Sequence, residues 1–284
     1  MHSIPLPGTG PALPALGLGT WRIGESKVRR PLEVKAVRSA LEMGWRLVDT
    51  AEMYGEGGSE EVIGLALAEA QRGGLRREEL FLVSKVYPHN ASRQGTVAAC
   101  ERSLRRLGVD RLDLYLLHWR GSVPLAETVQ ALQALVAAGR IARWGVSNFD
   151  VDDMQALWSV PGGDTCAANQ VYYSITERGP AHSLLPWLRA HGVALMAYSP
   201  LDQGALAEDA ALQALAERQG CSTAQLALAW LLAQPGVNAL PKAVGEAHLR
   251  ENLAAAEIVL TDEVKAGLAQ RYPAPARKPP LAMI

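Results

Sequence analysis

The chain alternates short apolar runs with longer amphipathic stretches, and this alternation constrains its fold more than any other feature. Eight runs rich in Val, Leu and Ile occupy residues 15–20, 47–49, 80–85, 112–118, 143–148, 167–170, 194–198 and 237–242. Stretches with helical periodicity separate them, at residues 32–43, 59–71, 92–107, 125–138, 181–191, 210–219 and 224–233. In a chain of 284 residues this order predicts an α/β fold, the (β/α)8 TIM barrel. The alternative is an open doubly wound sheet, but the GxGxxG loop that would start one is missing.

Local signals indicate where elements begin and end. Pro31 suits the first turn of a helix, Ser59 with two glutamates behind it suits a helix start, and Thr261 precedes a last helix. Residues 1–15 are rich in Pro and Gly and predict a short hairpin or loop laid over the outside. Residues 272–284 contain several prolines and predict an extended surface tail. With no internal boundary, residues 1–284 are expected to form a single domain.

Composition narrows the classes of partner. The net charge of −1 gives no global attraction to nucleic acid or to an anionic membrane. The start of the chain lacks the pattern of a signal peptide and no apolar run is long enough to cross a bilayer, so we expect a cytoplasmic protein. Cys100, Cys166 and Cys221 are odd in number and form no CxxC pair, which argues against disulfides and a zinc site. We interpret them as small buried hydrophobes.

Nearly every predicted strand ends in a polar or aromatic side chain, which hydrophobicity does not require. In chain order these ends are Thr20-Trp21, Asp49, Lys85, His118, Ser147-Asn148, Gln170, Tyr198-Ser199 and Lys242. In a barrel the carboxyl ends of all eight strands open on one face, where active sites are built. These scattered residues are therefore expected to form one ring.

Asp49 and Tyr54 are the most unusual members of the segment 45–64. A carboxylate beside a buried strand is costly without a cation, and Lys85 is the expected partner. A neighbouring ammonium lowers the pKa of a phenol from its reference of about 10, which would tune Tyr54 to donate a proton. His118 could donate a hydrogen bond to the same substrate oxygen. No HExxH, GxSxG or metal cluster is evident, so we expect no metal and a cofactor that supplies the remaining chemistry.

Eight segments, GLGTWRIG, LVDTAEMYGEGGSEEVIG, LFLVSKV, DLYLLHW, RWGVSNF, NQVYYS, AYSPL and LPKAVGEAHLRENL, resemble the successive signature segments of the aldo-keto reductases, over residues 16–252. The resemblance implies a catalytic tetrad of Asp49, Tyr54, Lys85 and His118, with Tyr54 protonating a carbonyl oxygen as NADPH delivers hydride. It also implies that nicotinamide and pyrophosphate lie against Thr20, Trp21, Asp49, Ser147, Asn148, Gln170, Tyr198, Ser199 and Leu201. Within that set Ser147, Asn148 and Gln170 would hold the carboxamide and Tyr198 would stack on the ring.

The adenosine end departs from the family pattern. Lys242 is kept as the cation for a 2′-phosphate, and Glu251 and Asn252 match the adenine contacts. Ala243 stands where a serine is usual, and His248 replaces an arginine with a titratable imidazole. We expect NADPH to be preferred, with NADH possible.

Trp21, Tyr87 and Trp119 are expected to form an aromatic wall at the mouth. Residues 120–124 and the tail are short, which predicts an open pocket for a small-molecule carbonyl. The chain looks most similar to bacterial reductases of methylglyoxal and other small or aromatic aldehydes, and by family resemblance it is expected to be monomeric.

Taken singly, each of these residues has a simpler explanation. Asp49 and Glu52 could cap a turn, Lys85 could extend from a strand end to solvent, and His118 could be a satisfied core histidine. Coincidence is a poor explanation for an Asp, a Lys and a His at the ends of consecutive strands. Two other functions remain open: a nicotinamide-nucleotide-binding barrel with little turnover, in a sensor or structural role, and an unrelated barrel hydrolase or isomerase.

Overall fold

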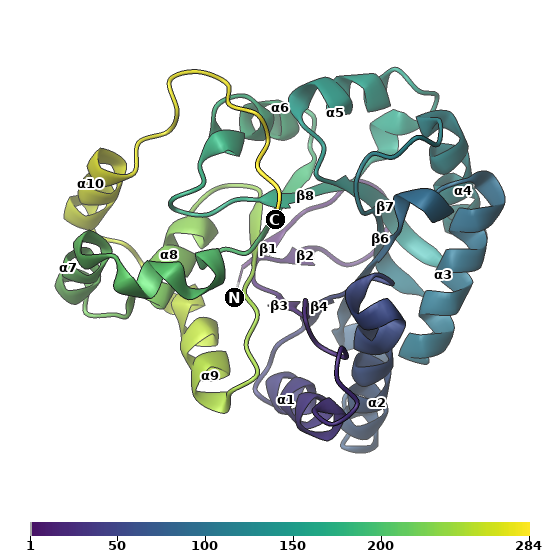
Figure 1. Cartoon of the computed structure of the whole chain (residues 1–284), viewed down its shortest axis with the longest axis horizontal. Coiled ribbons are helices and arrows are strands. Elements are labelled where there is room, and N and C mark those ends of the chain that lie inside the picture. The colour runs from purple at the N-terminus through teal and green to yellow at the C-terminus, as the bar shows by residue number, and fades with distance from the viewer. Residues whose placement is uncertain (1) are drawn as a thin grey trace.

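The protein, described by a computed structural model over residues 2–284, forms an eight-stranded parallel barrel surrounded by helices (Figure 1). The strands follow one another around the barrel in chain order: β3 (Leu18–Gly19), β4 (Leu47–Asp49), β5 (Phe81–Val86), β6 (Leu112–Leu117), β7 (Ile141–Ser147), β8 (Ala168–Tyr172), β9 (Ala194–Tyr198) and β10 (Val237–Leu240). A parallel bridge between Leu16 and Ala239 joins the first strand to the last. The Gly17 N–H also donates to the Ala239 carbonyl at 2.9 Å. The predicted TIM barrel is confirmed.

Ten α-helices cover the barrel and its ends: α1 (Arg30–Glu42), α2 (Gly58–Arg72), α3 (Arg93–Leu107), α4 (Leu125–Ala137), α5 (Val151–Trp158), α6 (Leu184–Ala190), α7 (Ala210–Gln219), α8 (Thr223–Leu232), α9 (Glu246–Ala254) and α10 (Asp262–Arg271), counted over residues 2–284. The prediction missed α5 and α9, which have only 8 and 9 residues and too few turns for a clear apolar stripe. Within the described part of the chain, no helix has the length and apolarity needed to span a bilayer.

Two hydrophobic cores hold these layers together. The main core fills the barrel and the space beneath α1 to α6, and its largest fully buried side chains include Trp45, Phe81, Tyr115 and Tyr173. A smaller core lies among α7, α8 and α10, around side chains such as Leu212 and Leu268. The second core fixes the segment that follows β9, which borders the barrel mouth.

The helix ends show which sequence signals reflect local capping. Thr261 caps α10, since its hydroxyl accepts from the Val264 N–H. Gly108 ends α3 in the left-handed region, at φ 66°. Ser59 does not cap: α2 already begins at Gly58, and the buried Ser59 hydroxyl lies 2.9 Å from the Thr20 hydroxyl and 3.0 Å from that of Thr50. The helix therefore starts within one residue of the predicted position, but the Ser59 hydroxyl bonds to threonines just beyond β3 and β4 and does not cap it.

The N-terminal hairpin closes the N-terminal end of the barrel. Its strands β1 (Ser3–Ile4) and β2 (Leu13–Pro14) are antiparallel, as predicted, while Met1 lies outside the described residues. The segment is more than an outer layer, because Ile4 and Leu13 belong to the main core. The mostly buried Arg143 of β7 donates to the carbonyls of Pro7, Gly10 and Pro11, at 2.7, 3.0 and 2.9 Å.

The C-terminal tail, residues 272–284, crosses the mouth of the barrel (Figure 1). Lys278 lies 2.9 Å from Asp150 and 2.8 Å from Asp152, which follow β7. Met283 and Ile284 then line the cavity at the mouth. The tail is extended, as predicted, and its ion pairs bring its last two residues to the edge of the cavity.

Candidate active site

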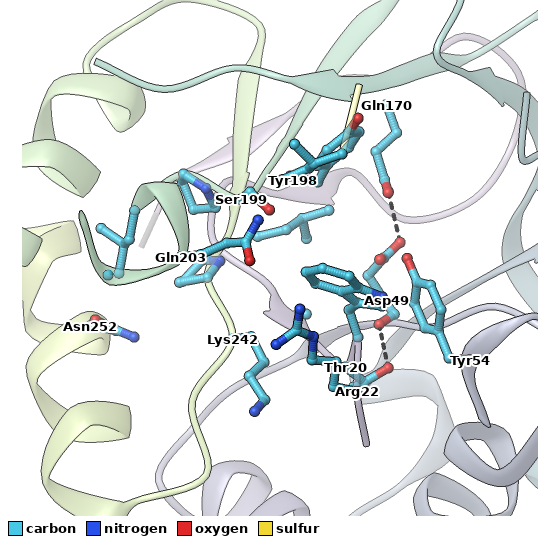
Figure 2. A pocket seen from close by; sticks show the side chains of 18 of the residues that line it. Thr20, Arg22, Asp49, Tyr54, Gln170, Tyr198, Ser199, Gln203, Lys242 and Asn252 are labelled. Atoms are coloured by element: carbon cyan, nitrogen blue, oxygen red, sulfur yellow. Dashed lines mark hydrogen bonds between the residues drawn. The ribbon is translucent and has the colours of Figure 1, made fainter. Parts of the chain in front are cut away.

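The carboxyl ends of the strands surround a cavity of about 720 Å³. Sixteen of the residues singled out from the sequence line it: Thr20, Trp21, Asp49, Tyr54, His118, Trp119, Ser147, Asn148, Gln170, Tyr198, Ser199, Leu201, Lys242, His248, Glu251 and Asn252. Asp49 and Tyr54 lie toward one end, and Lys242 and Asn252 toward the other (Figure 2). The cavity is thus an elongated site whose two ends have different chemistry.

Lys85 joins the carboxylate and the phenol from beneath. Its side chain is fully buried, and Nζ donates to Asp49 Oδ2 at 2.8 Å, to the Thr50 carbonyl at 2.9 Å and to the Tyr54 hydroxyl at 3.2 Å. Three acceptors satisfy all three ammonium protons, which makes a buried charge tolerable. The expected pairing of Asp49 with Lys85 is present, and it places an ammonium in direct contact with the phenol of Tyr54.

The loop between β4 and α2 brings Tyr54 to this ammonium. The loop runs through the 3₁₀ helix η1 (Tyr54–Gly57), in which Gly55 has φ 58°. A Cβ on Gly55 would lie 2.8 Å from the Gly24 carbonyl group, so only glycine allows the two loops to approach this closely. The glycines that flank Tyr54 in the sequence therefore serve the turn that delivers its side chain.

Burial, not the ammonium, dominates the acidity of Tyr54. Burial raises the pKa of Tyr54 above 10; Lys85 lowers it and Asp49 raises it, with a net upward shift. The expectation of a lowered pKa was therefore wrong, although Lys85 does oppose the rise. For Lys85 itself, burial lowers the pKa, but Asp49 and Tyr54 outweigh burial and the net shift is upward. At neutral pH the phenol is protonated and the amine is charged.

His118 lies beside the phenol in a neutral state. Its ring meets that of Tyr54 edge-on, with centroids 5.7 Å apart. Burial, and then the charge of Lys85, hold the pKa of His118 well below 6.5. A neutral imidazole can still donate one hydrogen bond to an oxygen in the cavity. It carries no charge that would compete with Lys85.

The ends of β7, β8 and β9 form a polar cluster linked to Asp49. The Gln170 amide donates to Asp49 Oδ1 at 2.8 Å (Figure 2), and the Ser147 hydroxyl donates to the Gln170 carbonyl at 2.8 Å. The Tyr198 hydroxyl donates to Asn148 Oδ1 at 2.9 Å. Asn148 also has φ 58°, a conformation that asparagine tolerates better than most residues. These four side chains hold one another and leave donor and acceptor groups along the cavity wall.

The far end of the cavity carries the residues expected at the adenosine. The cavity is lined there by Lys242, which follows β10, and by His248, Glu251 and Asn252 of α9. Burial lowers the pKa of Lys242, with Glu33 raising it and nearby arginines lowering it further. Ala243 is buried and does not line the cavity.

Of the three aromatic residues expected at the mouth, Trp21 and Trp119 line the cavity and Tyr87 does not. Tyr87 lies behind Trp119, edge-on, with ring centroids 6.0 Å apart. Tyr87 lies one residue past the end of β5 and directly before the 3₁₀ helix η3 (Pro88–Asn90), so the alternation of side chains along the strand no longer sets its direction. The wall is therefore formed by two tryptophans, with Tyr87 supporting one of them.

Several lining residues were missed in the sequence. Arg22 stacks on Trp21, with its guanidinium carbon 4.4 Å from the ring centroid, and has φ 65°. It projects into the cavity between Thr20 and Lys242 (Figure 2). Gln203 lines the opposite side with φ 55°. Arg22 follows directly on a predicted strand end, which was the available signal; Gln203 has none, because its loop is placed by tertiary contacts.

Within residues 2–284, no group of three or more His, Cys, Asp or Glu side chains is arranged to hold a metal ion. All three cysteines are free thiols. Cys100 and Cys166 are buried, as expected, whereas Cys221 is partly exposed.

Comparison with known proteins assigns the family. The model of the aldo/keto reductase family matches residues 15–271. Methylglyoxal reductase YeaE of Escherichia coli (strain K12) is 49% identical over 278 residues, 96% of each chain. Glyoxal reductase of Bacillus subtilis (strain 168) is 35% identical over 254 residues, 89% of this chain and 87% of that protein.

Solved structures agree with this assignment. The crystal structure of an aldo-keto reductase from Klebsiella pneumoniae in complex with NADPH is similar at a TM-score of 0.90 and 48% identity, covering 96% of each chain. The barrel, the site geometry and both kinds of likeness lead to one conclusion. This chain belongs to the aldo/keto reductase family and is an NAD(P)H-dependent oxidoreductase.

Proposed function

We propose that this protein reduces small carbonyl compounds, methylglyoxal and other 2-oxoaldehydes and aromatic aldehydes, to alcohols with NADPH, and that Tyr54 donates the proton. The observation that carries the proposal is the contact between the buried Lys85 ammonium and the Tyr54 hydroxyl, 3.2 Å apart, at one end of a cavity that reaches Lys242 at the other. Similarity to methylglyoxal and glyoxal reductases supports the choice of substrate.

Tyr54 would act as the acid. Its raised pKa keeps the phenol protonated at neutral pH, so the proton is already on Tyr54 when the substrate binds. As the proton leaves, negative charge grows on the phenol oxygen next to Lys85, and the ammonium stabilises it. Asp49 and Thr50 hold that ammonium in place.

His118 would orient the carbonyl. Being neutral, it can donate to the substrate oxygen without placing a second positive charge beside Lys85. It lies on the cavity wall with its ring edge-on to Tyr54, so both side chains can contact one oxygen atom. Together they would fix the position of the carbonyl carbon.

The cavity fits a nicotinamide dinucleotide. Buried polar side chains, Ser147 and Gln170, line the end near Tyr54 and suit an amide group. Lys242 and His248 at the other end suit a phosphate. When bound, reduced nicotinamide would supply the hydride that this set of residues lacks.

The substrate end is small and mostly apolar. Trp21, Trp119, Met53, Met283 and Ile284 line the cavity. Aromatic and thioether surfaces suit compact or flat carbonyl compounds. The tail residues restrict the opening, which disfavours large fused-ring substrates.

The test is a steady-state screen of methylglyoxal, glyoxal, benzaldehydes and aldoses with NADPH and with NADH. We expect NADPH oxidation that depends on the 2-oxoaldehydes and aromatic aldehydes, with a lower KM for NADPH than for NADH because of Lys242. NADPH binding without turnover over the whole panel would instead support a nucleotide-binding barrel with a sensor or structural role. Conversion of a compound without either nucleotide would contradict both.

A further inference from the structure

Two glutamates, Glu52 and Glu56, lie two residues before and after Tyr54. Both accept hydrogen bonds from Tyr87, which follows the neighbouring strand β5. Glu52 Oε1 accepts from the Tyr87 backbone N–H at 2.9 Å. Glu56 Oε1 accepts from the Tyr87 hydroxyl at 3.2 Å. The loop that carries Tyr54 is thus tied at two points to the segment that follows Lys85.

Glu52 makes the stronger attachment. It is 5% exposed, and its carboxylate also accepts from the Asn90 amide at 3.0 Å and from Arg102 of α3 at 3.1 Å. Its own backbone N–H donates to the Lys85 carbonyl at 3.3 Å. A buried carboxylate whose oxygens accept several hydrogen bonds restricts the movement of the segments that donate them.

Apart from these attachments, the loop packs closely on the backbone of Gly24 through Gly55 and Gly58. Gly55, Gly57 and Gly58 follow Tyr54 and have no side chains that could anchor the loop. Glu56 adopts φ 52°, a strained conformation for a residue with a side chain. Such a conformation persists only when neighbouring contacts enforce it, and the hydrogen bond to Tyr87 is one such contact.

We propose that Glu52 is a positioning residue: with Arg102 as its charge partner, it holds the Tyr54 loop against the end of β5 so that the phenol stays in contact with the Lys85 ammonium. The inference rests on the proposed function of Tyr54. Tyr87 then has a different role from the substrate wall expected of it, since it links the Tyr54 loop to Trp119.

The chain offers a matched control in Glu60. Glu60 is also buried, also pairs with an arginine of α3, Arg106 at 2.7 Å, and also accepts from a β5 side chain, Ser84 at 2.6 Å. It lies on α2, and its side-chain bonds go to neither Tyr54 nor Tyr87. Loss of either carboxylate should destabilise the fold, but only the loss of Glu52 should disturb the reacting groups.

The first experiment compares Glu52→Ala with Glu60→Ala for melting temperature, kcat and KM with NADPH and methylglyoxal. We expect both to lower the melting temperature. Glu52→Ala should lower kcat by about 10- to 100-fold at nearly unchanged KM for NADPH, because displacing a reacting group by about 1 Å has effects of this order. Glu60→Ala should keep the wild-type kcat. Equal kcat in the two variants would overturn the proposal.

A second readout needs no turnover. The phenol pKa of Tyr54 is measured by NMR of labelled tyrosine, with and without Lys85→Met. In an otherwise wild-type chain, Lys85→Met should raise this pKa. That rise should be smaller in the Glu52→Ala background than in the Glu60→Ala background, because the contact is already loosened. An equal rise would contradict the inference. A wild-type protein that binds NADPH but reduces no carbonyl refutes the proposed function instead, and this titration still decides the role of Glu52.

If Glu52→Ala gives no folded protein, Glu52→Gln and Glu60→Gln replace the alanine pair. Glutamine keeps an acceptor for the Tyr87 N–H but loses the charge that pairs with Arg102. A lower kcat for Glu52→Gln than for Glu60→Gln supports the proposal, and equal kcat values overturn it.

Discussion

Replacing Lys85 with methionine tests how one buried ammonium serves both the fold and the reaction. The substitution keeps the approximate volume of the side chain but removes three hydrogen bonds, of 2.8, 2.9 and 3.2 Å. Asp49 is left with the amide of Gln170 as its side-chain partner at Oδ1. A buried carboxylate that loses its cation destabilises a protein by about 3–5 kcal/mol. At roughly 2–4 °C per kcal/mol, the melting temperature should fall on the order of 10 °C.

Activity should fall further than stability explains. Without the ammonium, burial and the carboxylate both raise the pKa of Tyr54, and the phenolate formed on proton donation has no counter-charge. We expect kcat to fall by about 10²–10⁴-fold, the usual contribution of a positioned acid. Steady-state assays with methylglyoxal, run well below the melting temperature of the variant, measure this loss directly.

The double variant Asp49→Asn with Lys85→Met separates the two effects. Removing both charges leaves no uncompensated ion, so most of the lost stability should return. The ammonium next to Tyr54 is still absent, so kcat should stay low. Recovery of kcat together with the melting temperature would refute the reasoning, since Lys85 would then act through folding alone.

Three further predictions concern other parts of the molecule. The folded-state pKa of His118 lies well below 6.5, so as pH falls below about 6.5 the unfolded chain binds a proton that the folded chain does not, and stability should fall. In urea titrations, His118→Gln should reduce the dependence of the unfolding free energy on pH by up to about 1.4 kcal/mol per pH unit. Equal dependence in the variant and the wild type would contradict this. Lys242→Ala should weaken NADPH binding selectively, and equal losses for NADPH and NADH would count against its role at the 2′-phosphate. Lys278→Gln should speed amide hydrogen exchange in residues 281–284 without moving the melting temperature, and unchanged exchange would show that its contacts with Asp150 and Asp152 do not hold the tail.

The sequence was informative where position along a strand decides geometry. Asp49, Lys85 and Gln170 could be grouped because a parallel barrel brings all strand carboxyl ends to one face. Their hydrogen bonds in the structure follow from that topology and from the need to satisfy buried charge. Neither argument needs a knowledge of side-chain packing.

The sequence was uninformative where burial or a long-range contact decides. Burial raises the pKa of Tyr54, and its extent cannot be read from neighbours in the chain. Ser59 matched a helix cap but is held by Thr20, 39 residues away in sequence. The tail crosses the mouth because Lys278 meets two carboxylates more than 120 residues earlier. From the sequence, Glu52 is interpreted as a turn residue, and only the structure shows its partners Tyr87, just beyond β5, and Arg102 on α3.

The most direct test of the proposed function is Tyr54→Phe, which removes one oxygen atom from the site. We predict that NADPH binding stays at the wild-type level, while turnover of methylglyoxal falls by about 10²–10⁴-fold, because only the proton donor is lost. Turnover by Tyr54→Phe at the wild-type rate, with NADPH bound, would contradict the account and require another acid in the cavity.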